Sequence, residues 1–148
     1  MYNETQENIR KIMISVNRID GIYYKIAKRI GIKENTLSLF YALSDGKPHS
    51  QKEICDEWLV PRSTINTIVH ECVENGYVRF QRSTRSKMKV LLLTENGKKY
   101  ADELMNELFS VEQAAFLETL KRYDDGFVQA VSFFADELER QALHENDI

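Results

Sequence analysis

The stretch over residues 50–94, SQKEICDEWLVPRSTINTIVHECVENGYVRFQRSTRSKMKVLLLT, decides the fold of this chain. Near its start, Ser50 is followed three residues later by Glu53, which is the spacing of a helix-starting capping box. A short helix is therefore predicted to begin here. Its apolar side chains are Ile54, Trp58 and Leu59, and we expect them on the buried side.

A second helix is predicted after a very short connection. Pro61 suits its first turn, and Asn75-Gly76 suits a left-handed stop. The apolar positions between them form one stripe at helical spacing: Ile65, Ile68, Val69 and Cys72. The other face carries Ser63, Asn66, Thr67 and His70. This helix should thus bury one side and expose a polar, almost uncharged one.

Two strand-like runs, residues 77–81 and 89–94, come next, with Val78 and Phe80 pointing the same way. In and between these runs lie five basic side chains within eleven positions: Arg79, Arg82, Arg85, Lys87 and Lys89. A basic stretch is most often only a solvated surface. Because two helices with a tight turn precede it, we interpret this one as a β-hairpin with a cationic tip.

Further helices are predicted on both sides. Residues 4–30 carry apolar side chains at spacings of three and four, and Gly31 would end that helix. A shorter helical run over residues 37–43 stops at Gly46 and Pro48. Beyond Thr94, a long helix has heptad-like apolar positions at Ala101, Leu104, Leu108, Val111 and Ala115. A last helix from about residue 126 places Phe127, Val131, Phe134 and Leu138 on one stripe.

Length and composition favour one compact domain over residues 1–148, large enough to need no disulfide or structural metal. The two cysteines, Cys55 and Cys72, form no regularly spaced framework, which is typical of a reducing compartment. The polar N-terminus lacks a secretory signal, and no segment has the apolar length of a membrane span. We therefore expect a soluble, cytoplasmic protein.

Charge is unevenly distributed along the chain. Residues 61–90 hold six basic and two acidic side chains, a net charge of +4, whereas residues 100–148 hold three basic and twelve acidic ones, a net charge of −9. The whole chain carries a formal net charge of −3. One basic patch on an acidic protein argues against coating of nucleic acid in general and favours a focused polyanion site.

The order of helix, tight turn, helix and cationic hairpin predicts a winged helix-turn-helix in a mainly α protein with a small β-hairpin. In this layout the second helix lies in the major groove of DNA and the hairpin reaches phosphates or the minor groove. The candidate DNA contacts in the helix are Arg62, Ser63, Thr64, Asn66, Thr67 and His70. The candidate contacts in the hairpin are Arg82, Arg85 and Lys87.

The sequence also resembles the MarR-type transcriptional regulators over most of its length. The likeness lies in the long first helix, in SQKEICDEWLVPRSTINTIVHECVENGYV with its Gly-x-Val end, and in LLLTENGKKY, which is similar to the family's Leu-Thr-x-x-Gly start of the fifth helix. One departure is found in the hairpin. Where the family has Asp-x-Arg before the second strand, this chain has Arg85 and Lys87, and an ammonium lacks the two-pronged geometry of a guanidinium.

The resemblance implies a homodimeric repressor that binds a pseudo-palindromic operator in double-stranded DNA and responds to a small molecule. It implies a DNA-binding region over residues 33–97 and dimerisation by the helices in 1–31 and 98–148. The residue pattern also favours a dimer, because both terminal regions carry apolar stripes that a monomer of this size could bury only in part. No cofactor is implied.

Other chemistries find little support in the sequence. Tyr23, Tyr41, Trp58 and Phe109 could line an effector site, but aromatic side chains at helical spacing more often form core, so the sequence does not identify the residues of such a pocket. The cysteines and histidines lack metal-ligand spacing, Asp124 and Asp125 suit a helix cap, and no catalytic set can be nominated. The alternative to a DNA-binding regulator is a winged-helix module that binds proteins.

Overall fold

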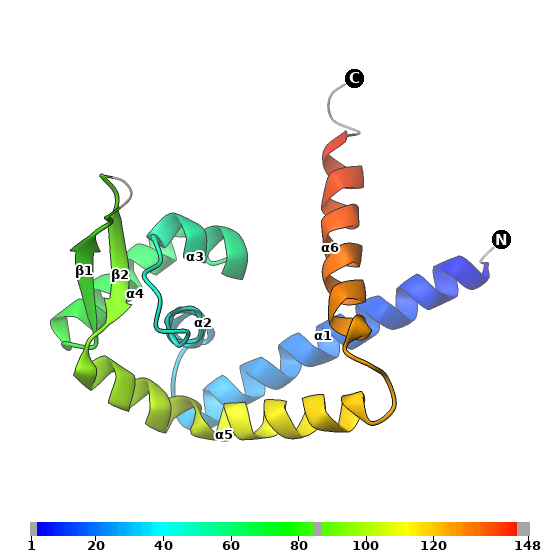
Figure 1. Cartoon of the computed structure of the whole chain (residues 1–148), viewed down its shortest axis with the longest axis horizontal. Coiled ribbons are helices and arrows are strands. Elements are labelled where there is room, and N and C mark those ends of the chain that lie inside the picture. Colours follow the sequence, from blue (N-terminus) through cyan, green and yellow to red (C-terminus); the bar gives the residue numbers. More distant parts are fainter. Residues whose placement is uncertain (1–2, 85–86, 145–148) are drawn as a thin grey trace. The chain divides into compact units, whose positions relative to one another are not determined.

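The computed structural model describes residues 3–84 and 87–144, and Figure 1 labels their helices and strands. In chain order these are α1 (Glu4–Ile30), α2 (Glu34–Leu43), α3 (Gln51–Trp58), α4 (Arg62–Glu74), β1 (Val78–Arg82), β2 (Lys89–Leu93), α5 (Glu95–Leu120) and α6 (Gly126–His144). The predicted element order and the mainly α fold with one hairpin are confirmed. Among the described helices, none is both long and apolar enough to cross a membrane.

Contacts divide the chain into two compact units, Met1–Asn106 and Glu107–Ile148. The first unit holds α1 to β2 and the start of α5. The second holds the rest of α5 and α6, where the Phe116 and Phe127 rings lie 5.7 Å apart. The single domain over residues 1–148 stays a prediction.

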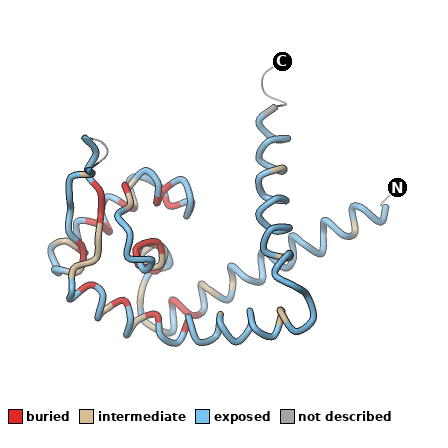
Figure 2. Tube along the Cα trace, viewed as in Figure 1, coloured by how far each residue is buried: buried red, intermediate tan, exposed pale blue. Residues whose placement is uncertain are grey.

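The core of the first unit lies where α2, α4, β2 and the start of α5 meet, as the buried segments in Figure 2 indicate. Its fully buried large side chains include Phe40, Leu39, Leu43, Ile65, Leu91 and Met105. An aromatic cluster extends this core, because Tyr77 stacks on Tyr100 at 4.2 Å and Phe40 packs against both rings. The hairpin and the start of α5 are thereby fixed against the helix-turn-helix.

Helix ends follow the predicted chemistry in most places. Gly31 ends α1 at φ 80° and Gly76 follows α4 at φ 74°, both in the left-handed region that glycine tolerates. Ser50 and Glu53 form the predicted capping box of α3. Asp124 accepts a hydrogen bond from the backbone N–H of Gly126 at 3.0 Å, in agreement with its interpretation as a helix-cap residue.

The prediction for the buried side of α3 is wrong in part. Ile54 is buried together with Cys55, but Leu59 is 86% exposed and Trp58 is 36% exposed. Leu59 ends α3 at φ 51°, a conformation rare for leucine, which turns its side chain outward while the following Val60 takes the buried position. In β1, Val78 is buried as expected, whereas Phe80 is 38% exposed because the hairpin extends beyond the core.

Candidate nucleic-acid interface

Helix α4 exposes the predicted contact residues. Ile65, Ile68, Val69 and Cys72 are buried and hold one side of the helix against the core. On the other side Arg62, Ser63, Asn66, Thr67 and His70 are exposed, and Thr64 is half-buried. The first turn contains no acidic residue, so the positive end of the helix dipole is not neutralised there. This face can therefore donate and accept hydrogen bonds in a groove of negative potential.

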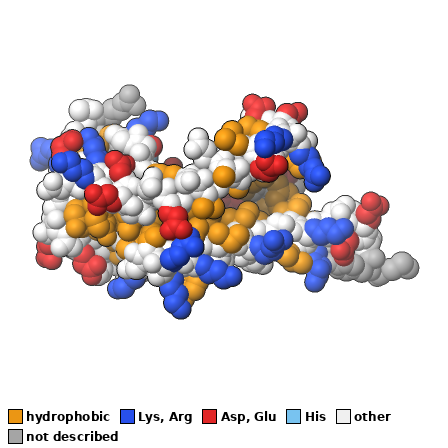
Figure 3. Space-filling view, turned by 90° about the horizontal axis from the view of Figure 1, so that it is seen from below, with side chains coloured by type: hydrophobic (Ala, Val, Ile, Leu, Met, Phe, Trp, Pro, Cys, Tyr) orange, Lys and Arg blue, Asp and Glu red, His pale blue; other side chains and the backbone are white. Residues whose placement is uncertain are grey.

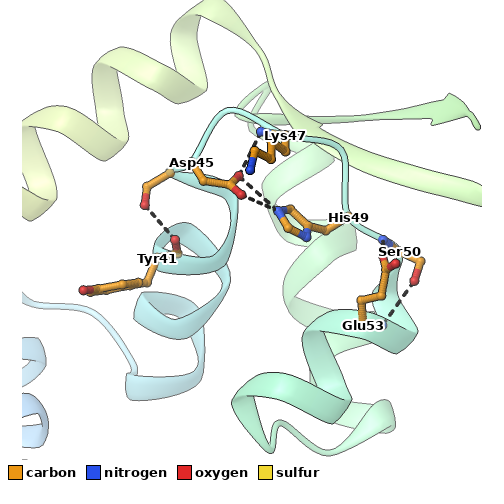
Figure 4. A network of polar contacts seen from close by, with 7 residues as sticks. Tyr41, Asp45, Lys47, His49, Ser50 and Glu53 are labelled. Carbon is orange, nitrogen blue, oxygen red and sulfur yellow. Dashed lines mark hydrogen bonds and ion pairs between the residues drawn. The ribbon is translucent and has the colours of Figure 1, made fainter. Parts of the chain in front are cut away.

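The start of α3 is fixed by its capping box, which Figure 4 draws in detail. The Ser50 backbone N–H donates to Glu53 Oε2 at 2.6 Å, and the Glu53 backbone N–H donates to Ser50 Oγ at 3.1 Å. The hydrogen bond from the Ser50 backbone lowers the pKa of Glu53, since it stabilises the carboxylate. Helix α3 therefore begins at a defined residue beside the N-terminus of α4.

The loop before α3 ties the helix-turn-helix to the hairpin. Asp45 accepts a hydrogen bond from the Lys47 backbone N–H at 2.8 Å and lies 3.0 Å from His49 Nε2 (Figure 4). Burial acts to raise the pKa of Asp45, but the hydrogen bonds from Lys47 and His49 outweigh it and lower the pKa. The His49 backbone exchanges two hydrogen bonds with Leu91 of β2, at 3.2 and 2.7 Å. A single-residue β-bridge thus joins this loop to β2.

The hairpin forms an antiparallel ladder that places like charges opposite one another. Arg82 of β1 pairs with Lys89 of β2 at the outer end of the ladder. Lys89 also lies over the ring of Phe80, at 5.7 Å from the centroid. Arg82 and Lys87 are exposed. Arg85, the other predicted contact, lies outside the described residues.

The structure brings four further polar residues to this surface that the sequence reasoning missed. Lys33 and Asn35, at the start of α2, share a hollow of about 350 Å³ with residues of α4 that include Ser63 and Thr67. Gln51 and Lys52, in the first turn of α3, share another of about 240 Å³ with Arg62. All four stand in the first turn or at the cap of a helix whose start faces α4. For Gln51 and Lys52, the helix start predicted at Ser50 was the available signal, whereas no such signal was available for Lys33 and Asn35.

A separate cavity of about 250 Å³ lies in the first unit and is lined by α1, α2 and the end of α3. Its lining residues are Asp20, Tyr23, Glu34, Leu37, Ser38, Tyr41 and Trp58. Three of the four aromatic residues considered for an effector site, Tyr23, Tyr41 and Trp58, therefore line this cavity. Tyr23 and Tyr41 are half-buried, and the indole of Trp58 lies 4.8 Å from the Tyr41 ring.

Both cysteines are buried and unpaired by any disulfide. Burial, with a smaller contribution from Glu71, raises the pKa of Cys72 to about 11. Burial also raises the pKa of Cys55, against a smaller opposing effect of Arg62. Over residues 3–84 and 87–144, no three His, Cys, Asp or Glu side chains are grouped to hold a metal ion.

Comparisons with known proteins agree with this geometry. Residues 30–87, which span α2 to the hairpin, match the model of the MarR family. A MarR family regulator from Neisseria meningitidis has the same fold, with 19% identity, a TM-score of 0.78, and coverage of 93% of this chain and 98% of that one. The transcriptional regulator BldR from Sulfolobus solfataricus is 17% identical, with a TM-score of 0.66, and the match covers 93% of this chain and 99% of that one.

Staphylococcus aureus MarR, solved in complex with salicylate and kanamycin, is 16% identical with a TM-score of 0.62, and the match covers 95% of this chain and 93% of that one. A search of curated protein sequences gave no significant match. The family match covers the helix-turn-helix and the first strand of the hairpin, and the shared fold extends over nearly all of the chain. On these grounds residues 30–87 are similar to the MarR family, and the chain has the fold of the MarR-type winged helix-turn-helix proteins.

Proposed function

We propose that this chain is a homodimeric repressor that binds specific sites in double-stranded DNA, with α4 in the major groove and the hairpin on the neighbouring backbone or minor groove. The observation that carries the proposal is the Arg82–Lys89 pair. Like charges directly opposite in a ladder destabilise a hairpin. A polyanion between them and the exposed Lys87 would offset that repulsion.

The face of α4 offers the side chains that read base edges. Arg62 has the fork that pairs with guanine, and Asn66 has the amide that pairs with adenine. Thr67 already donates its hydroxyl hydrogen to the Ser63 carbonyl at 3.2 Å, so its free lone pairs act as an acceptor. His70 and Thr64 complete the set of contact residues. Arg85 keeps its proposed role in the hairpin on sequence grounds alone.

Backbone contacts come from the helix starts beside α4. Lys33 at the cap of α2 and Lys52 in the first turn of α3 are exposed and flank the recognition helix. Phosphate contacts of this kind fix the register of a protein on the duplex without reading its sequence. We therefore assign a positioning role to these two lysines.

Dimerisation is proposed through the helices in residues 1–31 and 98–148. Helix α1 exposes a row of large apolar side chains: Ile9, Ile12, Met13, Val16 and Ile19. Helix α6 exposes Val131, Phe134 and Leu138, and such open apolar side chains are visible on the surface in Figure 3. Contiguous apolar surface of this kind marks an interface. A second copy is the partner that a two-fold operator requires.

A small-molecule effector is proposed for the cavity between α1, α2 and Trp58. The supporting observations are its aromatic lining and its position next to the helix-turn-helix. The Staphylococcus aureus protein of the same fold was solved with two small molecules. A DNA-binding regulator of this kind works in the cytoplasm, where it meets the chromosome.

The rival function is a winged-helix module that binds proteins. Protein interfaces are rich in aromatic side chains and poor in charge at their centre. The described face of α4 offers Arg62, Ser63, Asn66, Thr67 and His70, which suits base edges better.

The test is a selection of genomic fragments by the purified protein, followed by titration of the selected site and of a shuffled site at several salt concentrations. We expect the selected site to bind at least ~10³-fold more tightly than the shuffled one. Equal affinity for the two sites at every salt concentration contradicts specific recognition. A selected site that overlaps a promoter, with reduced transcription on addition of protein, supports repression.

The two-fold geometry has its own test on the same site. Half-sites should lie about one helical turn apart, so an insertion of about five base pairs between them should abolish tight binding. Insertion of about ten should restore much of it. Unchanged affinity in both cases contradicts a dimer that reads two half-sites.

A further inference from the structure

The cavity of about 250 Å³ beside the helix-turn-helix has charges of one sign. Asp20 of α1 and Glu34, in the first turn of α2, both line it. Among the described lining residues none is Lys, Arg or His. An anion in this space would lie near two carboxylates with no cation among the described lining residues, and like charges repel.

The rest of the lining is largely aromatic. The rings of Tyr41 and Trp58 lie 4.8 Å apart and are tilted by 46°, and Tyr23 lines the same space from α1. Aromatic faces attract cations through the negative potential above each ring, and tryptophan does so most strongly. Leu37, which is buried, supplies an apolar floor. The site therefore brings two carboxylate side chains and three aromatic side chains to one space.

The volume limits the size of that occupant. Drug-sized ligands fill pockets of roughly 300–1,000 Å³, and this cavity lies just below that range. It suits one ring or a short aliphatic body with a compact head group.

We propose that this cavity binds a small organic cation, a quaternary or protonated amine on an apolar body of about one ring. The ammonium lies between the Asp20 and Glu34 carboxylates and the faces of Tyr41 and Trp58. This inference rests on the proposed function, since it names the ligand class of the effector site. The cavity is lined by α1, α2 and the end of α3, so a cation bound there would contact both α1 and the helix-turn-helix.

The chain carries its own reporter for the test, because Trp58 is its only tryptophan. Benzyltrimethylammonium is titrated into the full-length protein while the fluorescence of Trp58 is followed. Neopentylbenzene, the uncharged molecule of the same shape, and salicylate, an aromatic anion, serve as comparators. We expect saturable quenching by the cation, binding at least ~5-fold weaker for the neutral molecule, and no saturable binding of salicylate.

Two charge-neutralising variants locate the site. Asp20→Asn and Glu34→Gln should each weaken binding of the cation at least ~5-fold, since one nearby unit charge is worth about that factor even in a high dielectric. The affinity for the neutral molecule should stay unchanged. Asp102→Asn removes an exposed carboxylate of α5 that does not line the cavity and should bind like the parent. Circular dichroism verifies the fold of each variant.

The outcomes separate this inference from the proposed function. Absence of cation binding at millimolar concentration, tighter binding of salicylate, or equal affinity of the parent and both cavity variants for the cation would each overturn the ligand class. The DNA titration is then repeated with saturating benzyltrimethylammonium, to measure whether the bound cation changes the affinity for DNA. Cation binding without any specific DNA binding supports the ligand class while the proposed function fails. Specific DNA binding without cation binding overturns only the ligand class.

Discussion

Gly97 in the first turn of α5 lies directly against the backbone of Tyr77, so closely that a Cβ on Gly97 would overlap the Tyr77 carbonyl oxygen. The same carbonyl accepts a hydrogen bond from the Thr94 backbone N–H at 2.9 Å. The Thr94 hydroxyl in turn accepts from the Gly97 backbone N–H at 2.9 Å and donates to the Gly76 carbonyl at 2.6 Å. These contacts join α4, the hairpin and α5 at one point.

Gly97→Ala is therefore expected to destabilise the protein by about 3 kcal/mol, the upper end for overpacking, because backbone atoms must move to admit the methyl group. Urea denaturation measures the change. Gly21→Ala is the matched control, since a Cβ at that helical position meets no atom within 4 Å and should stabilise α1 by about 0.5–1 kcal/mol. Equal stability of the two variants would contradict the close approach.

The helix start at this junction is predictable from the sequence, but the need for glycine at position 97 is not. The segment LLLTENGKKY predicts a helix start at Thr94, because local capping chemistry needs only neighbours in sequence. The role of Gly97 depends on Tyr77, twenty residues earlier, and only the packed fold brings the two together. The exposure of Leu59 escapes prediction for a similar reason, since periodicity cannot reveal where a helix ends in a left-handed turn.

The candidate interface is likewise predictable from the sequence in one part and not in another. The exposed face of α4 follows from helical periodicity and is confirmed as exposed, although its DNA contacts stay a prediction. Sequence analysis does not identify Lys33 and Lys52, because their nearness to α4 arises from tertiary packing of helix starts. The cavity that Tyr23, Tyr41 and Trp58 share is not predictable from the sequence, because three helices contribute to its lining.

The hairpin and α4 should respond differently to removal of their side chains. Lys87→Ala or Arg82→Ala is expected to weaken binding to all sequences and to reduce the salt slope by ~0.9 for each phosphate that is no longer neutralised. Asn66→Ala should leave the salt slope nearly fixed and lower discrimination by about 1–3 kcal/mol per base contact. Salt-series titrations on matched and scrambled operators measure both quantities. A reversed pattern means that the two elements exchange roles.

The capping box of α3 predicts a pH dependence of stability. Because the pKa of Glu53 is lowered in the folded state, its carboxylate adds stability above the ordinary value of 4.5, and this contribution is lost as the pH falls through the folded pKa. The unfolding free energy of Glu53→Gln should therefore lie below that of the parent at pH 7. The gap should narrow at acid pH below 4.5. A gap that stays constant from neutral to strongly acid pH rules out this ionic contribution.

Assembly should depend on the apolar stripe of α6. Val131→Asp introduces a charge at a position that is 65% exposed in one copy, so a folded monomer is the expected product, with a halved mass in light scattering. Gln129→Glu alters the opposite side of the same helix and should leave the dimer intact. A parent protein that is monomeric at micromolar concentration refutes the proposed interface.

Neither cysteine should react readily in the folded protein. The pKa of Cys72 is raised to about 11 and that of Cys55 is also raised, in both cases mainly by burial, so little thiolate exists near neutral pH. A thiol reagent at mildly alkaline pH should label both residues slowly in the native protein and fast after unfolding in urea. Rapid native labelling of one cysteine would identify a reactive thiol.

The hydrogen bonds between His49 and Leu91 bear on how regulation can operate. They attach the loop before α3 to the hairpin, while the Thr94 contacts attach the end of α4 to α5. These contacts therefore hold the two candidate DNA-binding elements, α4 and the hairpin, against one another. If the proposed dimer binds an effector, we expect the ligand to change DNA affinity through the distance and angle between the two copies of this unit. Operators with altered half-site spacing should then respond differently to the same ligand.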